Sequence, residues 1–63
     1  MKRYLYKNIV LRQSYGMWNA YYNDNKYGEY LMAIGFRTKV DAYIAGKAEV
    51  DSLNKAFSDL MEV

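Results

Sequence analysis

The pattern of apolar side chains changes once along this 63-residue chain, near Thr38, and the change limits what the chain can fold into. Before Thr38, β-branched and aromatic residues form short runs separated by asparagine, aspartate, glycine and serine, which is typical of strands and turns. After Thr38, apolar residues recur at intervals of three and four, which is typical of one face of a helix. We therefore expect an α+β fold in which a small sheet comes first and a helix follows.

Three segments are expected to form the strands, namely residues 3–12, 17–22 and 29–36. The polar stretch NDNKYG separates the last two, and Ser14 to Gly16 is the turn candidate between the first two. Connections this short favour a three-stranded antiparallel meander with the Trp18 strand in the middle. The run YLYKNIVL is also compatible with a helix, because a short apolar run does not distinguish the two structures.

A C-terminal helix is expected to begin at Lys39, since Thr38 is a natural N-cap and Asp41 occupies the acidic position of a capping box. Gly46 falls on the apolar stripe of this helix, so it either lets the helix approach the sheet closely or breaks it into two helices. The stripe comprises Val40, Tyr43, Val50, Leu53, Phe57 and Leu60.

The length predicts a single small domain, residues 1–63, with a thin core. The sequence has no cysteine and no histidine, so it has no disulfide framework and none of the usual ligands of structural zinc. It also lacks the histidine base or cysteine nucleophile of common hydrolytic sites, and it has no glycine-rich phosphate loop. We expect a non-enzymatic protein with no cofactor and no metal.

Strand alternation divides the aromatic stretch WNAYYNDNKYGEY between two faces of the sheet. One face should form the core with the helix, and the other should face outward. The predicted core set is Leu5, Ile9, Leu11, Trp18, Ala20, Tyr22, Tyr30, Met32, Ile34, Phe36, Val40, Ile44, Leu53, Phe57 and Leu60. The predicted outward set includes Glu29 and Ala33 together with the candidate partner-binding residues Tyr4, Tyr6, Val10, Arg12, Met17, Asn19, Tyr21 and Leu31.

The outward set is more apolar and aromatic than a sheet face that only contacts water. Contiguous patches of this kind on small proteins often mark an interaction surface, and tyrosine, methionine and arginine are enriched in interface cores. The alternative is that tyrosine is simply favoured in exposed strands and cross-strand pairs.

Residues 16–45, with GMWNAYYNDNKYG followed by IGFRTKVDAYIA, resemble the three-stranded-sheet-plus-helix DNA-binding domains of the plant ethylene-response type and of the integrase arm-binding type. The resemblance implies that the sheet enters the major groove, with Arg12, Asn19 and Tyr21 contacting bases and Lys26 at the turn. The charge distribution agrees in part, because residues 1–40 hold seven basic and two acidic side chains. The candidate phosphate contacts are Arg3, Lys7, Lys26, Arg37 and Lys39.

Two functions are therefore open. The first is a small regulator or inhibitor, similar in general appearance to the accessory proteins of phages and mobile elements, that docks on a larger protein or on a second copy through the outward face or a sheet edge. The second is a DNA-binding module. The sequence has no apolar run of the length that spans a bilayer, and we expect a cytoplasmic protein without a small-molecule substrate.

Overall fold

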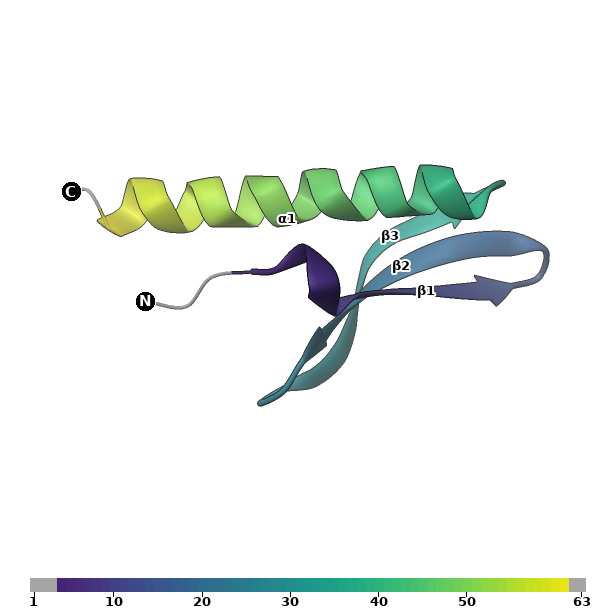
Figure 1. Ribbon diagram of the computed structural model, residues 1–63, viewed down its shortest axis with the longest axis horizontal. Helices are drawn as coiled ribbons and strands as arrows, with labels where there is room; N and C mark the ends of the chain where they lie inside the picture. The colour runs from purple at the N-terminus through teal and green to yellow at the C-terminus, as the bar shows by residue number, and fades with distance from the viewer. Residues whose placement is uncertain (1–3, 62–63) are drawn as a thin grey trace.

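The computed structural model describes residues 4–61, in which three antiparallel strands form one sheet and a C-terminal helix follows (Figure 1). The elements are a 3-10 turn, η1 (Tyr6–Asn8), and then β1 (Ile9–Ser14), β2 (Met17–Asp24), β3 (Gly28–Phe36) and α1 (Lys39–Met61). The strands pair in the order β1-β2-β3. The predicted α+β meander with Trp18 on the central strand is confirmed.

Residues 4–8 were predicted to belong to the first strand, and this part of the prediction is wrong; residue 3 lies outside the described residues. The chain forms η1 at Tyr6–Asn8, in which the backbone N–H of Asn8 donates to the Leu5 carbonyl at 3.1 Å. The Tyr22 hydroxyl accepts hydrogen bonds from the Leu5 N–H at 3.0 Å and from Asn8 Nδ2 at 3.1 Å. These contacts hold residues 5–8 against the sheet without strand pairing, so β1 begins only at Ile9 and continues to Ser14.

The polar turn between β2 and β3 is organised by Asp24. Its Oδ1 accepts the backbone N–H groups of Lys26 at 2.8 Å and Tyr27 at 3.1 Å. Asp24 pairs with Gly28, whose φ of 85° lies in the left-handed region that glycine adopts readily. The sequence NDNKYG therefore closes a three-residue hairpin loop, as its composition predicts.

Helix α1 begins at Lys39 as predicted, because the Thr38 Oγ1 accepts the backbone N–H of Asp41 at 3.1 Å. The helix runs unbroken past Gly46, and Gly46 lies against the sheet. A Cβ atom at this position would stand 3.2 Å from Ala20 Cβ and 3.3 Å from Ile9 Cγ2. Of the two interpretations of Gly46, close approach is confirmed and a break is wrong.

The close approach changes which helix face is buried. Ala42 and Val50, one turn on either side of Gly46, are fully buried. Val40, Ile44 and Leu60 were expected in the core but are exposed. Small side chains allow α1 to approach the sheet, and the larger apolar residues are left facing solvent. Figure 1 shows α1 crossing the sheet and extending beyond it toward its C-terminal end.

Strand β3 contains two irregularities that alter its faces. Its pairing with β2 shifts between Trp18 and Ala20 and again between Ala20 and Tyr21. Because each bulge adds a residue on β3, the simple alternation predicted from sequence is wrong over part of the strand. Ala33 pairs with Ala20 at the core, whereas Ile34, which was expected inside, is 67% exposed.

The aromatic core lies where β2 and β3 meet the start of the described chain. Tyr22 is only 2% exposed. The centre of its ring lies 5.1 Å from the centre of the Tyr4 ring and 5.6 Å from that of the Tyr30 ring. The Tyr4 ring also lies 5.9 Å from Phe57 of α1. Burial and a hydrogen bond with the Tyr4 side chain raise the pKa of Tyr30. Tyr4 is therefore a core residue, and its expected place on the outward face is wrong.

Candidate protein-binding surface

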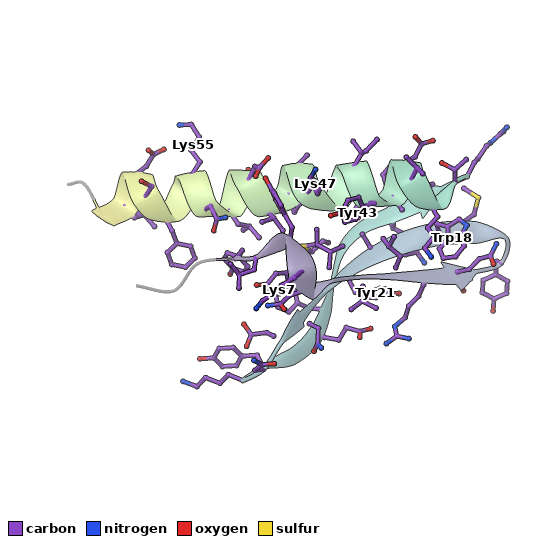
Figure 2. All side chains as sticks on the ribbon, in the orientation of Figure 1. Lys7, Trp18, Tyr21, Tyr43, Lys47 and Lys55 are labelled. Carbon is purple, nitrogen blue, oxygen red and sulfur yellow. The ribbon has the colours of Figure 1, made fainter. Side chains whose placement is uncertain are left out.

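The sheet face opposite α1 carries most of the residues expected there, and we call it the outer face. Val10, Tyr21 and Leu31 lie side by side across the three strands, since Val10 pairs with Tyr21 and Tyr21 pairs with Leu31. Figure 2 shows Tyr21 on the side of the sheet away from α1, with Trp18 on the side facing the helix. The outer face comprises Val10, Arg12, Met17, Asn19, Tyr21, Glu29, Leu31 and Ile34.

An open hollow of about 440 Å³ lies at the end of the outer face near the β1–β2 turn. Tyr21 and Met17 supply apolar walls from β2, and Ile34 supplies one from β3. The complete lining is Ser14, Tyr15, Met17, Asn19, Tyr21, Ile34 and Gly35. The hollow is open to solvent.

Tyr15 forms one border of the hollow and is fully exposed. It occupies the first position of a two-residue turn, where its φ is 53° and that of Gly16 is 77°. Such turns favour asparagine, aspartate or glycine at this position, because a left-handed backbone is unfavourable for a bulky side chain. The fold thus places a large aromatic ring in solvent at a position where it also carries backbone strain.

Ile34 is the outer-face residue that sequence alternation missed. Gly35 is the sequence feature that could have identified Ile34 as an outer-face residue, because an isolated glycine in a strand often marks a bulge. Gly35 has a φ of 85°, and the register shift beside it turns Ile34 outward. Leu31, which was expected on this face, is 49% exposed.

Asn19 is buried although it lies on the outer face. Its Oδ1 accepts the backbone N–H of Gly35 at 3.0 Å. This bond satisfies a donor that the bulge removes from regular strand pairing. Asn19 therefore supports the shape of the hollow, and its side-chain oxygen is already engaged.

Arg12 and Glu29 form a bidentate ion pair across the outer face. The Arg12 Nε lies 2.7 Å from Glu29 Oε1, and Nη2 lies 2.8 Å from Oε2. The hydrogen bond from Arg12 lowers the pKa of Glu29, and the Glu29 carboxylate raises the pKa of Arg12. The pair joins the two edge strands and leaves the outer face close to electrical neutrality.

Tyr6, like Tyr4, does not lie on the outer face. Its hydroxyl donates a hydrogen bond to the Asp51 carboxylate on α1, which raises the pKa of Tyr6. The Lys47 Nζ lies 5.1 Å from the centre of the Tyr6 ring and 5.5 Å from that of Tyr43. Figure 2 shows Lys47 and Tyr43 on α1. Tyr6 thus attaches η1 to the helix.

The candidate nucleic-acid contacts do not gather on one surface of the described chain. Lys26 lies in the β2–β3 turn, whereas Arg37 and Lys39 lie beyond the opposite end of β3. These positions lie at opposite ends of β3, whose nine residues span roughly 25–30 Å at ~3.3 Å per residue. The Lys39 Nζ lies 5.6 Å from the Trp18 ring, and Lys7 is exposed in η1. Arg3 lies outside the described residues.

Within residues 4–61 there is no cluster of three or more acidic side chains placed to hold a metal ion. In the same part of the chain, no helix combines the length and the apolar composition that crossing a membrane requires.

No protein-family model, curated protein or solved structure matches this chain.

Proposed function

We propose that this protein is a binding module whose outer face docks on a larger protein, with the hollow receiving an apolar side chain of that partner. The observation that carries the proposal is the direction of Ile34. The fold uses a bulge, a left-handed glycine and a buried asparagine to hold an isoleucine in solvent beside Tyr21 and Met17. Departures from locally favourable structure of this kind are concentrated at functional sites.

The charge of the outer face supports an apolar partner surface. Arg12 and Glu29 neutralise each other, so neither is available as an unpaired charge for a highly charged ligand. The apolar residues around them are Val10, Met17, Tyr21, Leu31 and Ile34. An apolar centre bordered by a satisfied polar pair is the usual composition of a protein interface.

The test begins with capture of proteins from the native host, with and without nuclease, followed by quantitative binding of the captured protein to variants. Tyr21→Ala and Leu31→Asp should each weaken binding by at least tenfold, because residues at an interface centre contribute most of the affinity. Ile44→Asp is the matched control, since Ile44 is a similarly exposed apolar residue (59%) on the helix. Equal binding by all three variants would contradict the proposal.

The second hypothesis is DNA binding through the sheet. The same purified protein can be used to distinguish DNA binding from protein binding. Binding to random duplex or single-stranded DNA should be measurable at low salt and should fall steeply between 50 and 200 mM salt if phosphates are contacted, by roughly tenfold or more for a few contacts. An apolar protein interface should respond little over this range.

A further inference from the structure

The two edges of the sheet differ in how they are protected from pairing with another strand. At the β3 edge, two bulges and Gly35 interrupt the regular backbone spacing. At the β1 edge, the register with β2 is unbroken from Ile9 to Ser14. Natural proteins protect edge strands with bulges, prolines or charged side chains. Strand β1 has no proline, and its only charged side chain, Arg12, is bound by Glu29.

The register identifies which backbone groups of β1 point outward. Ser14 and Met17 close a two-residue turn, so they form the first hydrogen-bonded pair, and the pairing alternates from there. Val10, Arg12 and Ser14 therefore exchange hydrogen bonds with β2, whereas Leu11 and Gln13 direct their N–H and C=O groups away from it. Ile9 directs its C=O the same way, but its N–H donates to the Tyr6 carbonyl in η1. Within residues 4–61, no strand lies beyond this edge.

We propose that two copies of the chain pair edge to edge through β1, antiparallel about a twofold axis at Leu11, to form a continuous six-stranded sheet. Leu11 then lies opposite its own copy, and Ile9 lies opposite Gln13 of the second chain. Four backbone hydrogen bonds result, namely two between the Leu11 residues and one from each Gln13 N–H to the opposite Ile9 carbonyl. On the outer face, Val10 lies opposite Arg12 of the second chain, so no two like charges are directly opposed.

A second copy is favoured as the occupant of this edge because β1 is complementary to itself about Leu11, with Leu11 opposite Leu11 and no like charges opposed. The single chain also exposes more surface than a compact monomer of its mass. The accessible surface is 4793 Å², whereas a folded monomer of this mass is expected to expose about 4,200 Å². The radius of gyration is 12.5 Å, against about 10.6 Å for a compact chain of this length. The surplus of about 600 Å² approaches the ~800 Å² that each partner buries in a standard interface.

The geometry also leaves room for both helices. A twofold axis perpendicular to the sheet places both copies of α1 on the same face. Six strands at ~4.8 Å spacing span about 24 Å between the outermost strands, which accommodates two helices at ~10 Å separation. The two outer faces then form one surface, with the hollows at separate positions on it, so self-association and the proposed partner binding do not compete.

The first test is the molar mass of the purified full chain, measured by light scattering and sedimentation over a range from micromolar to millimolar concentration. A dimer is expected. Gln13→Pro should raise its dissociation constant by at least tenfold, because proline removes the outward N–H donor of residue 13 and leaves every hydrogen bond to β2 in place. Gln13→Thr is the matched control and should stay dimeric. A monomer at every concentration, or a dimer that Gln13→Pro leaves unchanged, would overturn the proposal.

A second variant keeps the test informative if Gln13→Pro does not fold. The chain has no cysteine, so Leu11→Cys introduces a single thiol on the proposed axis. Directly paired residues have Cα atoms ~5.5 Å apart, within the range that a disulfide bridges. Mild oxidation should yield a covalent dimer with Leu11→Cys and little with Ala48→Cys on the exposed helix surface. Equal yields from the two variants would exclude the β1 interface, whatever the outcome of partner capture with Tyr21→Ala.

Discussion

The two faces of the sheet differ in how far their apolar side chains are covered. The inner face meets α1 through small residues, with Ala20 in contact range of Gly46 and with Ala42 buried nearby. The outer face holds larger apolar side chains, among them Ile34 and Leu31, in solvent. Large rings such as Tyr22 are also buried on the inner face, and burial of a large apolar side chain contributes about 1.5–3 kcal/mol. Leu31 and Ile34 on the outer face lack much of this gain because they are exposed. Burial on the inner face contributes to stability, and the exposed outer face is the surface that we propose for contact with another molecule.

The sharpest separation of the two faces uses adjacent residues of β2. Tyr22→Ala removes a buried ring and the hydroxyl that binds Leu5 and Asn8. It should lower the free energy of unfolding by about 3–5 kcal/mol, enough to unfold much of a chain this small. Tyr21→Ala should lower the free energy of unfolding by less than about 1.5 kcal/mol, because Tyr21 is only half-buried, while it weakens partner binding by at least tenfold. Urea denaturation followed by circular dichroism measures the free energy of unfolding of both variants. Similar losses of stability in the two would show that the two faces do not differ in their contribution to folding.

The next largest effect is expected at the closest approach of α1 to the sheet. Gly46→Val places branched carbons against Ala20 and Ile9, where a single Cβ is already within 3.3 Å. Overpacking of this kind should lower the free energy of unfolding by about 1–3 kcal/mol, despite the better helix propensity of valine. Ala48→Val, on the exposed side of the same helix, is the control and should change stability by less than about 0.7 kcal/mol. Thermal unfolding of both variants distinguishes packing from propensity.

The bulge on β3 can be tested at Asn19. Asn19→Ala leaves the Gly35 N–H without its acceptor and should cost about 1–3 kcal/mol. Because the bulge also sets the direction of Ile34, partner affinity should fall in the same variant. Asn23→Ala, an exposed position on the same strand, should change neither quantity. Normal affinity in a destabilised Asn19→Ala protein would show that Ile34 does not depend on this bond.

Substitution of Tyr15 should raise stability, in contrast to the substitutions above. Tyr15→Asn replaces a bulky residue with one that tolerates the left-handed backbone, so it should raise the free energy of unfolding by up to about 1 kcal/mol. The same change removes an aromatic ring from the border of the hollow and should weaken partner binding. Denaturation and binding measured on one preparation would reveal this trade of stability for function. A loss of stability would mean that the ring has an intramolecular role.

The smallest effect is expected from the Arg12–Glu29 pair, because both groups are exposed and solvent screens them. Arg12 lowers the pKa of Glu29 in the folded protein. The stabilisation is therefore fully present above the ordinary carboxyl pKa and is lost as the pH falls through the lowered value. Wild type and Glu29→Gln should differ slightly in urea midpoint near neutral pH, and the difference should disappear as the pH falls below the lowered pKa of Glu29. A constant difference across this range would rule out the ion pair as its cause.

The predictable part of the fold is what local chemistry determines. The helix begins after Thr38 because the Thr38 hydroxyl accepts a backbone N–H of the first turn. The β2–β3 turn closes because the Asp24 carboxylate accepts a backbone N–H and because Gly28 adopts a left-handed φ angle. The start of β1 was not predictable in this way. Residues 5–8 leave the strand conformation because the Tyr22 hydroxyl, 14 positions or more along the chain, binds them.

The candidate site was predictable to the extent that strict alternation holds. It places Val10, Met17 and Tyr21 on one face of β1 and β2, where no register shift occurs between the two strands. It fails on β3, where bulges exchange Ala33 and Ile34, and before Ile9, where Tyr4 and Tyr6 turn toward the helix. Periodicity alone also misjudged the buried face of α1, because the depth of helix packing depends on the small residues that face each other.

The central claim, that the outer face is the contact surface, is tested most directly by photo-crosslinking. A benzophenone side chain introduced at Ile34 or at Ile44 compares two apolar positions of similar exposure, one on the outer face and one on α1. We expect the captured partner to crosslink to position 34 and not to position 44. Crosslinking at position 44 without any at position 34 would contradict the account and assign contact to the helix.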